Sequence, residues 1–118
     1  MTLAECYAAM GADLEGIKRR LPKESLIQKL LLMLPRDRSY EELKAGLEAG
    51  DYDAAFRAAH TLKGVALNLG VTPLAQSAAT LTDALRGGAP TQEPEPLFRQ
   101  VTEDYQRTIH AIEQLDGE

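Results

Sequence analysis

Residues 51–70 read DYDAAFRAAHTLKGVALNLG. When they are placed on a helical wheel at about 100° per residue, the apolar side chains gather in one arc on the side opposite His60. The arc consists of Ala55, Ala58, Ala59, Leu62, Val65, Ala66 and Leu69. Such a stripe is typical of a helix that packs one face against a core. The stretch therefore predicts a long amphipathic helix on which His60 faces solvent.

The face that carries His60 combines positive charge with a missing side chain. Arg57 and Lys63 lie about 60° from His60 on either side, and Gly64 lies one turn along the helix. Glycine inside a helix costs about 1 kcal/mol relative to alanine, so we expect the bare backbone to serve a purpose. An outward imidazole with two cations and open space beside it suits a phosphoryl group on the ring. We therefore interpret His60 as a phosphate acceptor.

Residues 58–64, AAHTLKG, contain the order H-x-x-K-G and are followed by Gly70. This pattern resembles the histidine-containing phosphotransfer (HPt) domain. The resemblance implies a four-helix bundle that carries phosphoryl groups between aspartates of response-regulator receiver domains. It also implies that His60 is phosphorylated, that Lys63 is the cation at the phosphate, and that Gly64 is the small residue beside it. Val65 and Ala66 stand where the family often has small hydroxyl residues, so no local hydroxyl help is expected.

The resemblance implies a phosphocarrier rather than a kinase. The sequence contains no P-loop, no kinase glycine loop and no other nucleotide motif, so we expect no autokinase activity from ATP. The expected partner is a response-regulator receiver domain, with a hybrid histidine kinase as a further candidate. No cofactor is expected in this chain, and the receiver is expected to supply a divalent metal ion. His110 has no acid or cysteine arranged to share a ligand with it, so no metal site is expected there.

Two residues further along the same helix each have two interpretations. Leu67 lies close to His60 on the wheel and is either an ordinary exposed leucine or a docking contact for the receiver, which we favour. Asn68 is either a polar residue near a helix end or a hydrogen-bonding partner of the phosphoryl group or the receiver. The alternative for the whole face is a helical docking module that binds a signalling partner without accepting phosphate.

Composition indicates one all-α domain. The 118 residues are 44% hydrophobic and 26% charged but only 5% aromatic, which favours helices over a β-sandwich. The net charge of −5 argues against nucleic-acid binding. Cys6 is the only cysteine, which excludes an internal disulfide and favours the cytoplasm. No stretch reaches the roughly 18 apolar residues of a membrane span, so we expect no membrane partner. We also expect a monomer.

The N-terminal third predicts two short helices before the bundle begins. Thr2 and Glu5 form a capping-box pattern, Gly11 interrupts the first helix, and a second short turn follows Asp13. The segment KESLIQKLLLMLP, residues 23–35, is apolar nearly all round. Such a helix is expected to be covered on most sides.

The remaining helices are expected to follow one another through short turns. Ser39 is expected to cap a helix, Asp51 to cap the His60 helix, and Gly70 to end it. Thr72 is expected to cap the next helix, with Pro73 as its first residue. That helix carries an apolar stripe of Leu74, Ala78, Leu81 and Leu85. A last helix, from about residue 95 to 115, repeats Phe98, Val101, Tyr105, Thr108 or Ile109, and Ile112.

These patterns predict an antiparallel four-helix bundle with short extra N-terminal helices. We assign residues 1–118 to a single HPt-like domain, with the core bundle at about 23–115. The breaker-rich stretch at 87–94 is expected to form a mobile loop.

Overall fold

The structure is a computed structural model that describes residues 1–115. These residues form helices joined by short connections and contain no β-strand. The helices are α1 (Leu3–Met10), α2 (Leu14–Arg20), α3 (Glu24–Met33), the 3-10 turn η1 (Leu34–Arg36), α4 (Ser39–Ala49), α5 (Tyr52–Leu69), α6 (Thr72–Leu85) and α7 (Pro94–Glu113). The expected all-α fold is confirmed.

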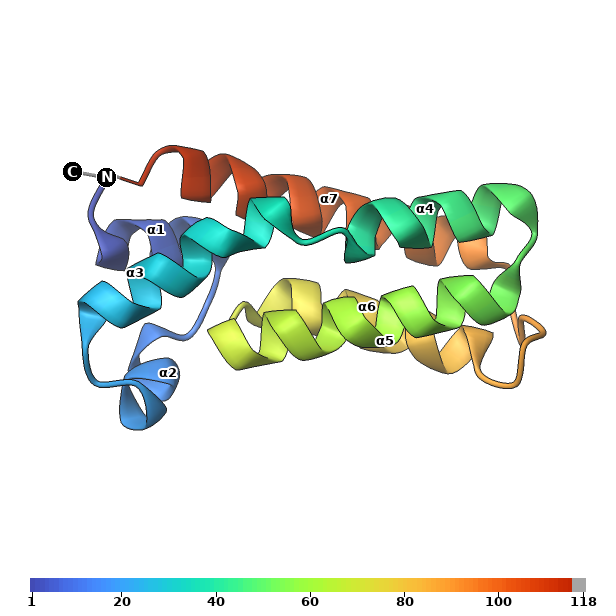
Figure 1. The fold of residues 1–118 in the computed structure, drawn as a ribbon, viewed down its shortest axis with the longest axis horizontal. Helices are drawn as coiled ribbons and strands as arrows, with labels where there is room; N and C mark the ends of the chain where they lie inside the picture. The colour runs from blue at the N-terminus through green and yellow to red at the C-terminus, as the bar shows by residue number, and fades with distance from the viewer. Residues whose placement is uncertain (116–118) are drawn as a thin grey trace.

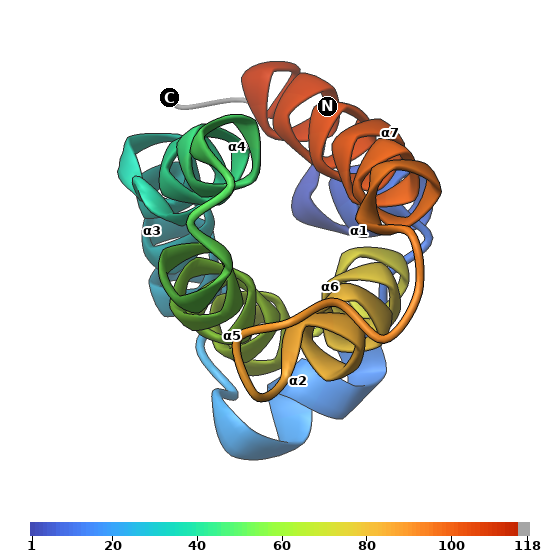
Figure 2. The ribbon, with the colours of Figure 1, turned by 90° about the vertical axis from the view of Figure 1, so that its right-hand side faces the viewer.

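Helices α4, α5, α6 and α7 surround one core, as the view along the bundle shows (Figure 2). Successive helices in this group run in opposite directions (Figure 1). Helix α3 and η1 continue the line of α4 toward the chain termini, and α1 packs along α7. The expected antiparallel four-helix bundle with short extra N-terminal helices is therefore confirmed.

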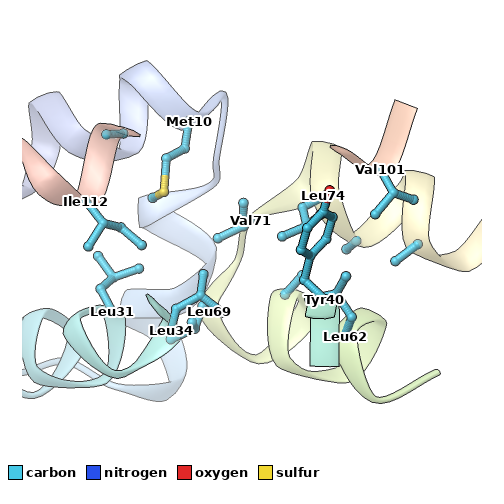
Figure 3. Packing of buried hydrophobic residues seen from close by; sticks show 14 of the residues in the cluster. Met10, Leu31, Leu34, Tyr40, Leu62, Leu69, Val71, Leu74, Val101 and Ile112 are labelled. Atoms are coloured by element: carbon cyan, nitrogen blue, oxygen red, sulfur yellow. The ribbon is translucent and has the colours of Figure 1, made fainter. Parts of the chain in front are cut away.

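The buried apolar side chains form one cluster to which every α-helix contributes. Figure 3 shows part of this cluster. The stripe predicted on α6 is fully buried, and α4 contributes Leu43. In α7, Val101 and Ile112 are buried, whereas Phe98, Tyr105 and Ile109 pack against the edge of the cluster. Because each helix turns its apolar side toward this cluster, core packing determines which side of each helix faces solvent.

Tyr40 closes the bundle between α4 and α7. Its ring stacks on Tyr105, with 4.2 Å between the ring centroids, and on Phe98, with 5.6 Å. Its hydroxyl oxygen lies 2.8 Å from Oγ1 of Thr102. Because the rings bury apolar area while the hydroxyl keeps a partner, this contact joins the first and last bundle helices.

The caps predicted at Thr2 and Asp51 are confirmed, and Asp13, after which a second short turn is expected, also caps its helix. Thr2 Oγ1 accepts a hydrogen bond from the Glu5 backbone N–H at 3.1 Å, and the Glu5 carboxylate accepts one from the Thr2 N–H at 2.8 Å. Asp13 caps α2 through the Gly16 N–H at 2.9 Å, and Asp51 caps α5 through the Ala54 N–H at 3.1 Å. These bonds satisfy backbone donors that would otherwise have no partner within the helix.

Two other predicted caps are wrong by one residue. Ser39 is the first residue of α4 and is buried, and its N–H donates to the Asp37 carboxylate at 2.8 Å. Asp37 thus supplies the oxygen expected from Ser39. Thr72 is the first residue of α6 rather than its cap, and Val71 holds the cap position. Val71 is fully buried, so core packing sets the start of this helix.

The expectation that residues 23–35 are covered on most sides is wrong. In α3 only Ile27 and Leu31 are buried. Leu26, Leu32 and Met33 are 40%, 42% and 57% exposed, because α3 packs through one side only. Neither α3 nor any other helix within residues 1–115 has the length and apolar character to cross a membrane.

The connection between α6 and α7 spans residues 86–93, one residue earlier at both ends than the expected loop 87–94, since α6 ends at Leu85 and α7 begins at Pro94. It is attached to α6 by the Thr91 N–H, which donates to the Ala84 carbonyl at 2.8 Å. Its mobility stays a prediction. Helix α7 ends at Glu113, two residues before the expected end near Leu115.

Candidate functional site

Helix α5 presents His60 to solvent, as the wheel predicts. Of the expected apolar arc, Ala55, Ala58, Ala59, Leu62, Ala66 and Leu69 are buried, and only Val65 is partly exposed. His60 lies on the opposite side and is exposed. Packing of the arc against the bundle core therefore fixes the direction of the imidazole.

The other predicted site residues lie on the same side of α5. Arg57, Leu67 and Asn68 are exposed, and Lys63 and Gly64 are half-buried. A Cβ atom built on Gly64 would have no neighbouring heavy atom within 4 Å, apart from the local helix itself. The space beside Gly64 is therefore open, so packing within the chain does not require glycine there.

His60 borders a shallow hollow of about 340 Å³. The sequence predicts His60 and Arg57 as site residues but not the other residues that line it. Its lining residues are Phe56, Arg57, His60, Thr61 and Arg86. The Phe56 and His60 ring centroids are 6.2 Å apart. The guanidinium carbon of Arg86 lies 5.4 Å from the centre of the Phe56 ring. Phe56 could have been found from its spacing of four residues before His60, whereas Arg86 requires the pairing of α5 with α6.

Lys63 lies in a different hollow, of about 520 Å³, between α2, α5 and α6. Leu67 lines the same hollow, together with Gln76 and Ala79 of α6. Within residues 1–115 no hydrogen bond or ion pair holds the Lys63 ammonium group. Its charge is therefore free to meet an anion that approaches α5 from outside.

A further hollow, of about 580 Å³, lies on the other side of Leu67, between α3 and α5. We call it the α3/α5 groove. Its apolar lining consists of Leu21, Leu30, Met33, Leu34, Val65 and Leu69, and its polar lining of Arg20, Arg36, Asp37 and Asn68. Leu67, which is 55% exposed, is flanked by this groove and by the Lys63 hollow. The exposed Leu67 thus has a hollow on each side. Both hollows begin about one to two turns after His60 on α5.

The N-terminal helices hold the end of α5 that carries these hollows. Tyr7 donates its hydroxyl proton to the buried Leu69 carbonyl at 2.6 Å. Arg20 donates from Nη2 to the carbonyls of Leu67 and Asn68, at 3.4 and 3.1 Å. Because the last carbonyls of a helix have no partner within it, these bonds complete the end of α5. Helices α1 and α2 therefore help to position the candidate site.

Other reactive groups lie away from this face. Cys6 is buried in α1, and burial raises the pKa of its thiol. His110 is exposed on α7. In the described part of the chain, no three His, Cys, Asp or Glu side chains are arranged to hold a metal ion.

A family model described as "Hpt domain" matches residues 3–117, which is essentially the whole chain. No curated protein and no solved structure matches the chain. The family match covers α5, its exposed histidine and all the other helices described above.

Proposed function

Because the chain belongs to the Hpt domain family, we propose that it is a histidine phosphotransfer protein of a two-component phosphorelay. Hpt domains are phosphocarrier modules of two-component systems. In our proposal, His60 takes a phosphoryl group from an aspartate of one receiver domain and passes it to an aspartate of another. A hybrid histidine kinase that contains a receiver is a further candidate partner.

The observation that carries the proposal is the exposure of His60 on a helix whose opposite face is buried. The imidazole is accessible, and its direction is set by core packing rather than by a ligand. Arg57 lies beside it, Lys63 has no partner within residues 1–115, and Gly64 leaves open space. This combination of a nucleophile, positive charge and access suits an incoming phosphoryl group.

The transfer follows from the chemistry of a neutral imidazole. The ring nitrogen that carries the lone pair attacks the phosphorus atom of the aspartyl phosphate. The P–O bond to the carboxylate breaks and the carboxylate leaves with the electron pair, while a P–N bond forms. The other ring nitrogen keeps its proton, so the product is a phosphoimidazolium. In such transfers the protein mainly positions groups and offsets charge, which is the role we assign to Lys63.

The receiver is proposed to dock across Leu67, with apolar side chains entering the α3/α5 groove and the Lys63 hollow. Exposed apolar residues that adjoin shaped hollows are typical of protein-binding surfaces. The acidic pocket and divalent metal ion that this chemistry uses would come from the receiver. Under this proposal the chain acts in the cytoplasm, where its free Cys6 thiol stays reduced. It does not phosphorylate itself from ATP.

The test is to mix the purified chain with a receiver that carries radioactive phosphate on its aspartate. The proposal predicts label on the chain that is labile to acid and stable to base, and no label from ATP alone. A receiver that binds the chain without transferring label would instead support a docking module. Label stable to acid would contradict a phosphohistidine.

A further inference from the structure

The Arg86 side chain lies across the boundary between α6 and α5. Its backbone follows the last residue of α6, yet its guanidinium carbon lies 5.4 Å from the centre of the Phe56 ring in α5. Its Nη2 atom also forms an ion pair with the Asp83 carboxylate at 3.1 Å. A cation over an aromatic face is attracted by the ring. Phe56 and Asp83 therefore hold an exposed arginine in one place near His60.

The hollow beside His60 has an excess of positive charge. Two of its five lining residues, Arg57 and Arg86, carry guanidinium groups, and no carboxylate lines it. This contrasts with the net charge of −5 of the whole chain. Asp83 pairs with Arg86 but does not itself line the hollow. The hollow is therefore suited to an anion.

We propose that Arg86 binds the phosphoryl group carried by His60 from the hollow that contains Phe56, four residues before His60, whereas Lys63 lies three residues after it. This inference rests on His60 as the phosphate acceptor. Guanidinium groups match phosphate oxygens with two parallel donors, which a lysine cannot do. Arg86 and His60 line the same hollow, and the Phe56 ring, which adjoins both side chains, orients the guanidinium group before the phosphoryl group arrives. Arg86 thus acts on the phosphorylated state and stabilises it relative to the free histidine.

The test begins with the phosphorylated chain alone. Phosphoramidate, which loses ammonia as it phosphorylates histidine, loads His60 without any receiver. The ³¹P NMR signal then gives the pKa of the phosphoryl group. A cation that contacts the phosphoryl group favours its dianion, so Arg86→Gln should raise this pKa by about 0.5. Arg86→Lys should behave between Gln and wild type, because it keeps the charge and loses the paired donors.

Phe56→Leu tests the orientation of Arg86. This variant keeps an apolar side chain but removes the ring, so it should raise the phosphoryl pKa by less than Arg86→Gln does. Arg99→Gln is the matched control, because Arg99 is exposed on α7 and forms a similar ion pair, with 3.7 Å between its Nη2 atom and Oε1 of Glu95. It should leave the pKa unchanged.

The second measurement uses a receiver and follows how the label is divided at equilibrium. Arg86→Gln should shift this division toward the receiver by about tenfold, the effect of one charge-assisted contact. If wild type accepts label but Arg86→Gln gives the same values as the control Arg99→Gln in both measurements, the inference is overturned. A weaker affinity for the receiver with an unchanged phosphoryl pKa would also overturn it. If wild type takes no label from receivers but Arg86→Gln raises the pKa, the relay function fails and the Arg86 contact stands.

Discussion

Replacement of Gly64 should change stability and transfer in opposite directions. An ideal Cβ atom at Gly64 has no contact within 4 Å, so Gly64→Ala introduces no clash. Alanine in place of an interior helical glycine stabilises by about 0.5–1 kcal/mol. A chain of 118 residues unfolds with an entropy of about 0.25 kcal/mol/K, so Tm should rise by about 2–4 °C.

Transfer should slow in Gly64→Ala and stop in Gly64→Gln. The open space beside Gly64 lies one turn along from His60, where the phosphoryl group and the receiver's loops would pass. A methyl group narrows this approach, and a Gln side chain fills it. The assay pairs thermal melts with transfer rates from a phosphorylated receiver on the same preparations.

Gly46 supplies the contrasting control for the melts. A Cβ atom there would lie 2.9 Å from the backbone nitrogen of Ala55, because α4 and α5 pack closely at this point. Gly46→Ala should therefore destabilise the fold by about 1–3 kcal/mol. A Gly64→Gln variant that melts normally and transfers at the wild-type rate would refute a functional role for the glycine.

Three further changes test the site and its support. Lys63→Ala should still accept phosphate but about 10- to 100-fold more slowly, as expected for the loss of one charge-assisted contact; an unchanged rate would leave Lys63 a surface lysine. Leu67→Asp should weaken receiver binding about tenfold by calorimetry, since it removes about 1.5 kcal/mol of apolar burial, whereas Leu26→Asp, away from the grooves, should not. Burial raises the pKa of the Tyr7 hydroxyl, so the folded state keeps this proton to higher pH than the unfolded chain. The contribution of this pKa difference to the free energy of unfolding is complete below about pH 10 and is lost as pH rises through the folded-state pKa. The free energy of unfolding in urea should therefore fall less steeply with alkaline pH in Tyr7→Phe than in wild type. An equal fall in the two proteins would contradict this.

The sequence could predict the direction of His60 because α5 packs through one regular face. Helical spacing alone separates the arc from Ala55 to Leu69 from the side that bears the histidine. The caps at Thr2 and Asp51 could also be predicted, because each depends on residues three apart in the chain. Local features of this kind do not depend on the rest of the fold.

The exposed side of α3 could not be predicted from its composition. Apolar residues lie on all sides of this helix, so periodicity does not say which side is covered. Only its tertiary contacts bury Ile27 and Leu31 and leave Met33 exposed. Those contacts create the α3/α5 groove, which the sequence analysis did not include.

The position of Arg86 depends on how α5 and α6 pair. Arg86 is 26 residues after His60 in the sequence, and the turn at Gly70 brings the two helices together. A register for this hairpin would place Arg86 near Phe56, but the direction of its side chain also depends on Asp83. The resemblance in the H-x-x-K-G motif therefore predicts an acceptor in His60 but does not point to Arg86 beside it.

The most direct test of the account is to map the labelled residue. Wild type, His60→Gln and His110→Gln are incubated with a receiver that carries radioactive phosphate, and each variant's melt is recorded. Wild type and His110→Gln should carry equal acid-labile, base-stable label. His60→Gln should melt like wild type, because the side chain is exposed, and should carry none. Label on folded His60→Gln would contradict the assignment of His60 as the phosphate acceptor.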